Sequence, residues 1–83
     1  MEDRIAIIGI IIDDMDSVAG VNDLLHDYGM YIVGRMGLPY RERNVNIISV
    51  VIDAPNDVIN TLAGNLGKLN GVTAKAVYSK MPS

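Results

Sequence analysis

Two aliphatic runs, residues 5–12 and 45–52, constrain the fold of this chain more than any other feature. Each run is rich in Ile or Val and is too short for a typical core helix, so both predict buried strands, the first of them buried on both faces. Neither run approaches the ~20 apolar residues that cross a bilayer. Because Asp13 and Asp14 close the first run, it also lacks the flanks of a signal peptide. We therefore expect a soluble, cytoplasmic protein without a membrane segment.

Between the two runs, the spacing of apolar residues changes to that of a helix. The helical stripe consists of Val18, Val21, Leu25 and Tyr28. This stripe predicts a helix over residues 15–28, which ends at Gly29. Residues 30–36 predict a second strand that ends at Gly37, since Pro39 prevents regular ladder pairing, and this strand is expected at a sheet edge.

The second half of the chain repeats this order. Asn56 is predicted to N-cap a helix whose apolar stripe runs over residues 58–69, and Asn70-Gly71 then turns the chain. In residues 72–78 apolar and polar side chains alternate, which predicts a half-exposed edge strand protected by Lys75.

The predicted order of elements is therefore β-α-β-β-α-β, two βαβ halves joined by right-handed crossovers. This order predicts an α+β, ferredoxin-like sandwich, in which a four-stranded antiparallel sheet carries both helices on one face. The first and third strands are expected at its centre, which agrees with their aliphatic character. At 83 residues the chain is long enough for one such domain and too short for two.

Both central runs carry aliphatic side chains on both faces, although helices cover only one face of such a sheet. At least six aliphatic residues are left on the other face, and their burial is worth on the order of 10 kcal/mol. We therefore predict a homo-oligomer, either a C2 dimer or a dimer of dimers, that packs through this face. The alternative is a cover formed by the link 40–44 and the C-terminal tail. The predicted interface residues are Ile8, Ile10, Ile48 and Val50.

The composition excludes several functions that this fold supports in other proteins. Without Cys, the chain has no thiolate metal site, iron–sulfur cluster or cysteine nucleophile. Neither aliphatic run contains the aromatic residues on which RNA-binding sheets stack bases. Ten acidic against seven basic residues, a net charge of −3, argue against a nucleic-acid surface. The sequence shows no candidate nucleophile, no pair of residues for acid–base catalysis and no cofactor-binding loop. We therefore expect a protein that is not an enzyme.

Two groups of residues resemble metal ligands, but we expect neither to bind a metal. His26 is the only histidine, and a lone imidazole beside surface carboxylates is typical of a solvated residue. Asp13, Asp14 and Asp16 lack the later ligands of an EF-hand, and helix capping explains them. They would also repel a phosphate at this junction. We predict neither a metal nor a cofactor.

Three arginines lie close together around Gly37-Leu38-Pro39, on the connection between the second and third strands. Their guanidinium groups could hold a carboxylate, a phosphate or a partner protein through forked hydrogen bonds. Alternatively, Glu42 and nearby aspartates neutralise an exposed loop. The candidate binding site comprises Arg35, Gly37, Pro39, Tyr40, Arg41 and Arg43.

Two segments resemble a known family. They are Arg35-Met36-Gly37-Leu38-Pro39-Tyr40-Arg41-Glu42, followed by Asn46-Ile47-Ile48, and Leu62-Ala63-Gly64-Asn65-Leu66-Gly67-Lys68-Leu69-Asn70-Gly71-Val72. Both look like the iron-only hydrogenase system regulators, short ACT-like proteins akin to the ligand-binding domain of the nickel-responsive repressor NikR. The similarity extends over nearly the whole chain. It implies one ACT-like regulatory domain over residues 1–83, homo-oligomerisation and a regulatory role linked to hydrogenase genes.

Two differences from the nickel repressor shape the expected function. We expect no ribbon-helix-helix segment ahead of the first strand, and the histidine and cysteine ligands of nickel are missing from the sequence. We therefore expect a non-enzymatic oligomeric module that senses a small-molecule effector or binds a protein partner, such as a separate DNA-binding protein. The alternative is a direct DNA-binding or metal-responsive transcription regulator. Its basic face would form across subunits from Arg35, Arg41, Arg43 and Lys75.

Overall fold

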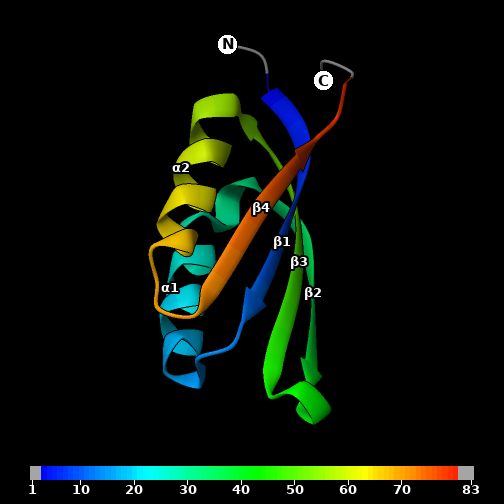
Figure 1. Ribbon diagram of the computed structural model, residues 1–83. Helices are drawn as coiled ribbons and strands as arrows, with labels where there is room; N and C mark the ends of the chain where they lie inside the picture. The colour runs from blue at the N-terminus through cyan, green and yellow to red at the C-terminus, as the bar shows by residue number, and fades with distance from the viewer. Residues whose placement is uncertain (1–2, 81–83) are drawn as a thin grey trace.

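The computed structural model describes residues 3–80, and its elements follow the predicted order (Figure 1). The strands are β1 (Asp3–Ile12), β2 (Ile32–Tyr40), β3 (Val45–Pro55) and β4 (Val72–Tyr78). The α-helices are α1 (Val18–Asp27) and α2 (Asn56–Gly67), and the short 3₁₀ segments are η1 (Met15–Ser17), η2 (Gly29–Tyr31) and η3 (Arg41–Arg43). The strands form one antiparallel sheet in the order β2-β3-β1-β4. The predicted α+β ferredoxin-like fold, with the first and third strands at the centre, is confirmed.

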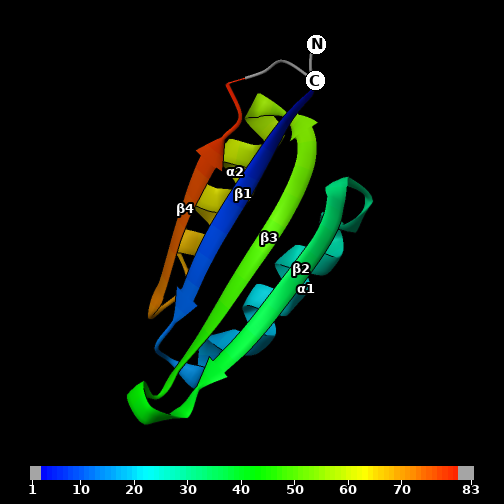
Figure 2. The same cartoon turned by 90° about the vertical axis from the view of Figure 1, so that its right-hand side faces the viewer.

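Both helices lie on the same side of the sheet (Figure 1). Figure 2 looks onto the other side, where the strands lie in front of α1 and α2. In this view α2 lies behind β1 and β4, whereas α1 lies behind β2. The sheet therefore has a covered face, which carries the helices, and an open face, which none of the described helices covers.

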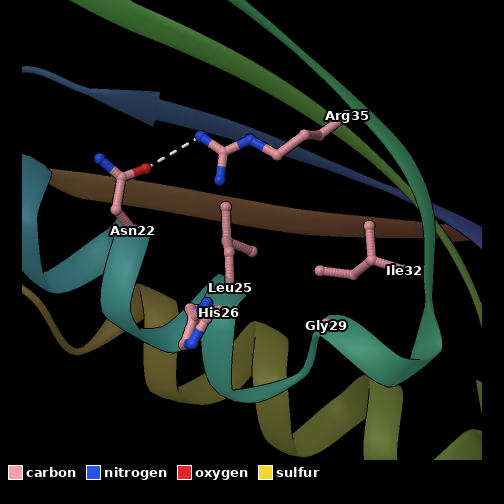
Figure 3. Close-up of a pocket in the computed structure, with 6 residues that line it drawn as sticks. All are labelled: Asn22, Leu25, His26, Gly29, Ile32 and Arg35. Carbon is pink, nitrogen blue, oxygen red and sulfur yellow. Dashed lines mark hydrogen bonds between the residues drawn. The ribbon is translucent and has the colours of Figure 1, made fainter.

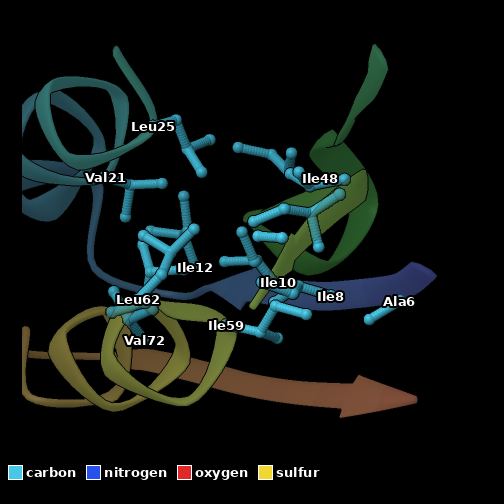
Figure 4. Packing of buried hydrophobic residues seen from close by; sticks show 14 residues of the cluster. Ala6, Ile8, Ile10, Ile12, Val21, Leu25, Ile48, Ile59, Leu62 and Val72 are labelled. Carbon is cyan, nitrogen blue, oxygen red and sulfur yellow. The ribbon is translucent and has the colours of Figure 1, made fainter. Parts of the chain in front are cut away.

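The hydrophobic core lies between the helices and the covered face (Figure 4). Every second residue of β1 from Ala6 to Ile12 is buried there. Directly paired residues of antiparallel strands share a face, so Val50 and Ile48 of β3 join their partners Ile8 and Ile10. The helices contribute Val21, Leu25, Ile59, Leu62 and Leu66, and Ile52 of β3 and Val72 of β4 complete the set of large buried side chains.

The predicted interface residues are corrected by this arrangement. Ile8, Ile10, Ile48 and Val50 are buried in the core beneath the helices, so they are not available to a partner. The alternate residues of β1 face outward instead, and the first strand is therefore not buried on both faces as predicted. Both alternating sets are aliphatic, so the sequence pattern did not reveal which one the helices cover.

Several boundaries differ from the prediction by a few residues, and two of these differences have a clear physical reason. β2 continues beyond Gly37 to Tyr40, and Pro39 pairs with Asn46. A proline is tolerated on an edge strand, because its missing N–H can face away from the ladder. Helix α2 begins at Asn56 itself, and Pro55 occupies the N-cap position without a side-chain hydrogen bond. The predicted capping role of Asn56 is therefore wrong.

Candidate functional site

The predicted binding segment lies along β2 and η3, at one edge of the sheet. Arg35, Gly37 and Pro39 pair with residues 50, 48 and 46 of β3, so all three project toward the covered face. They are nevertheless exposed, as is most of β2. Helix α1 therefore does not seal this part of the sheet, and a groove remains between α1 and β2.

The Arg35 side chain crosses this groove toward α1 (Figure 3). One terminal nitrogen of its guanidinium donates a hydrogen bond of 2.9 Å to Oδ1 of Asn22. Within residues 3–80 no carboxylate forms an ion pair with Arg35. The guanidinium thus reaches the site with its positive charge unpaired and its position fixed by a neutral amide.

The groove consists of three adjoining cavities. The largest, about 350 Å³, is lined by Asn22, Leu25, His26, Gly29, Ile32 and Arg35 (Figure 3). The second, about 270 Å³, shares Asn22 and Arg35 with the first and extends to Gly37, Pro39 and Asn46. The third, about 220 Å³, shares Pro39 and Asn46 with the second and ends at Tyr40 and Arg41. These shared residues make one continuous surface, which we call the α1–β2 groove.

The structure brings most of the predicted site residues to this groove, but not to one point. Arg35 separates the two larger cavities, whereas Arg41 lies at the far end, where η3 turns back into β3. Asn44 closes that turn in the left-handed conformation, with φ of 59°. Arg43 lines none of the three cavities. Lys75 lies on β4, at the opposite edge of the sheet from β2, so the four basic residues do not converge within one chain.

Two site residues were missed by the sequence reasoning. Asn22 and His26 both line the largest cavity from α1, four residues apart and therefore on one side of the helix. The i, i+4 spacing of two polar residues beside Leu25 is the only signal that could have indicated them. His26 was considered only as a metal ligand. In the part of the chain that the structure describes, no cluster of His, Asp and Glu is suited to hold a metal ion.

The chain also shows a clear similarity to a known protein family. Residues 4–76 match the TM1266-like family, described as iron-only hydrogenase system regulator. The chain belongs to this family. The regulator family suggested by the segments at 35–48 and 62–72 is thereby confirmed, and so is its ferredoxin-like, ACT-like fold.

Solved structures agree with this assignment. The structure of the uncharacterized protein TM1266 from Thermotoga maritima is 40% identical in sequence, with a TM-score of 0.91, over 95% of this chain and 100% of the other. A formyltetrahydrofolate deformylase from Pseudomonas putida KT2440 is 16% identical, with a TM-score of 0.67, over 93% of this chain and 29% of the deformylase. The second likeness concerns the fold alone. No curated protein matches the chain. Within residues 3–80, no helix is long and apolar enough to cross a membrane.

Proposed function

We propose that this regulator family member is a non-enzymatic, homo-oligomeric module. Its open sheet face packs against a second copy, and its α1–β2 groove receives a small effector or a segment of a partner. Contact with DNA would pass through a separate DNA-binding protein, because the chain has a net charge of −3 and Lys75 lies at the opposite edge of the sheet from the three arginines. The observation that carries the proposal is the apolar character of the open face.

The open face displays aliphatic side chains from all four strands. It comprises Ile5, Ile7 and Ile11 of β1, Met36 and Leu38 of β2, Ile47 and Val51 of β3, and Val77 of β4. Ile7 is 47% exposed, Val77 69% and Met36 71%. Covering such half-exposed side chains is worth roughly 5–10 kcal/mol in total, which is comparable with the stability of a small domain. A surface of this kind is typical of a protein interface.

Two small residues at the centre of the face favour a second copy as the occupant. Gly9 of β1 pairs with Ser49 of β3, and a Cβ atom added at Gly9 would meet nothing within 4 Å. Nothing within the described chain therefore requires glycine at this strand position, where it weakens the strand and can mark the close approach of another backbone. The row that these two residues form ends in Lys75 of β4 and Met36 of β2, and an identical face offers matching aliphatic rows on either side of it.

The alternative cover does not fit the described residues. The link after Tyr40 forms η3 at the end of the sheet and does not fold over the open face (Figure 2). The tail continues beside β1, because the backbone N–H of Ser79 donates to the carbonyl of Ile5 at 2.9 Å. Residues 81–83, the end of the tail, lie outside the described residues.

Sedimentation equilibrium at micromolar concentration tests the oligomer directly. We expect a dimer or a dimer of dimers, since the open face should not remain in water. A single 9.0 kDa species over the whole concentration range would contradict the proposal.

Replacing Ile7 by aspartate should dissociate the oligomer. Ile7 lies between Val51 and Val77 on the open face, so Ile7→Asp would bury a carboxylate without a partner in the interface. We expect the dissociation constant, measured by sedimentation, to rise roughly 100-fold or more. The matched control is Met30→Asp, at a residue of η2 that is 84% exposed and does not belong to the open face. An unchanged dissociation constant for Ile7→Asp would refute this interface.

A further inference from the structure

We infer that the largest cavity of the α1–β2 groove binds a small organic monocarboxylate with an apolar tail, whose carboxylate pairs with Arg35. The inference rests on the proposed function, because it names the chemical class of the effector. Three properties of the cavity support it: the unused hydrogen-bond donors of the Arg35 guanidinium, the mainly apolar lining and the nearby C-terminal end of α1.

The Arg35 guanidinium is anchored by Asn22, but most of its hydrogen-bond donors have no partner within the described chain. It has five N–H donors, and the structure shows one hydrogen bond, to Asn22. Figure 3 shows the guanidinium extending above Leu25 and toward α1, so this exposed side chain is anchored along the wall of the cavity. The remaining donors form a fork that suits the two oxygens of a carboxylate, with no competing anion among residues 3–80.

The rest of the cavity is mainly apolar. Leu25 and Ile32 project into it from α1 and from the start of β2, and Gly29 leaves the wall between them without a side chain (Figure 3). His26 adds one polar group to the lining. A volume of about 350 Å³ lies in the range of small-molecule sites, where a few polar groups orient a ligand on apolar walls. One cation beside an apolar wall selects a ligand with one charged end.

The end of α1 disfavours a more highly charged anion. His26 belongs to the last turn of α1, and Gly29 follows it, so the cavity lies beside the C-terminal end of the helix. The carbonyl groups at such an end carry partial negative charge. Phosphate would meet this charge with only one guanidinium to compensate it. A monocarboxylate can place its charge at Arg35 and its apolar tail against Leu25 and Ile32.

This inference can be tested by titrating the full chain with simple carboxylic acids and monitoring its backbone amide chemical shifts by NMR. The probes are isovalerate and phenylacetate, with isovaleramide and inorganic phosphate as matched comparisons. We expect saturable shifts around Leu25, Gly29 and Ile32 with the acids at millimolar concentrations, and much weaker ones with the amide and with phosphate. Arg35→Ala should weaken acid binding roughly tenfold or more, and Arg35→Lys should restore part of it.

Lys68→Ala is the control, because Lys68 is an exposed cation at the C-cap of α2, the helix that lies behind β1 and β4 and not beside β2 (Figure 2). It should leave acid binding unchanged. Equal binding of acid and amide, or equal affinity in Arg35→Ala, would overturn the inference, as would shifts confined to other residues. Sedimentation of the same samples separates the two proposals. An oligomer that binds none of the acids would refute the carboxylate site alone, and a monomer that binds them through Arg35 would refute the oligomeric role alone.

Discussion

Replacing Ile10 by alanine is expected to lower the free energy of unfolding by about 2–5 kcal/mol. Ile10 is fully buried on the covered face, where Figure 4 shows it near Ile48 of β3. Its partner on the other side is Ala74 of β4. Truncation removes buried methyl and methylene groups and leaves a cavity that the close-packed neighbours cannot fill. Urea denaturation at one fixed protein concentration, followed by circular dichroism, measures the loss.

Ile11→Ala is the matched control for this prediction. Ile11 has the same side chain and is the next residue of the strand, but it faces the open side with 47% exposure. In the isolated chain its truncation should cost only about 1 kcal/mol, since half of its surface is already in water. If the open face is an interface, this cost should grow with protein concentration, whereas the cost of Ile10→Ala should not. Equal, concentration-independent losses would contradict the assignment of the two faces.

The fold could be predicted because its main constraints are local. The two aliphatic runs indicated the central strands, while Pro39 indicated an edge, and the sheet order confirms both. The choice of covered face could not be predicted in the same way. Each central strand is aliphatic on both sides. Which set of side chains is buried therefore depends on the side of the sheet that the helices occupy, and this side is set by the crossover connections and not by the strand pattern.

The candidate site was predicted in part, for a related reason. The Arg-x-Gly-x-Pro pattern at residues 35–39 alternates along one strand, so its three members share a face and reach the groove together. Asn22 contacts Arg35 only through the packing of α1 beside β2, and no spacing along the chain reveals such a contact. Arg43 is close to the others in sequence, but η3 turns the backbone after Tyr40 and separates it from the groove.

Replacing Gly71 by alanine is expected to destabilise the chain by about 2–4 kcal/mol. Gly71 has a φ of +68°, and its carbonyl accepts a hydrogen bond of 2.8 Å from the backbone of Asp13. A Cβ atom at this position would lie 2.5 Å from Oδ1 of Asp13 and 2.8 Å from the backbone nitrogen of Asp14. The turn before β4 would therefore have to move away from the end of β1. Urea denaturation measures the change.

Gly64→Ala is the control for a general effect of adding a methyl group. Gly64 lies within α2, and a Cβ atom there would meet nothing within 4 Å, so alanine should stabilise the chain by about 0.5–1 kcal/mol. A loss at Gly64 similar to that at Gly71 would contradict the steric explanation.

A second variant, Gly71→Asn, separates the two causes of the loss at this turn. Asparagine tolerates a positive φ better than alanine does, but it carries the same Cβ atom. If the backbone conformation were the main cost, asparagine would recover most of the stability. We expect it to recover little, because the nearest obstacles include the backbone of Asp14, which a side-chain rotation cannot move aside. The hydrogen bond from the backbone N–H of Asp13 to the carbonyl of Gly71 also holds the two segments close to each other. Making room for a Cβ atom therefore requires the end of β1 and the start of β4 to move apart.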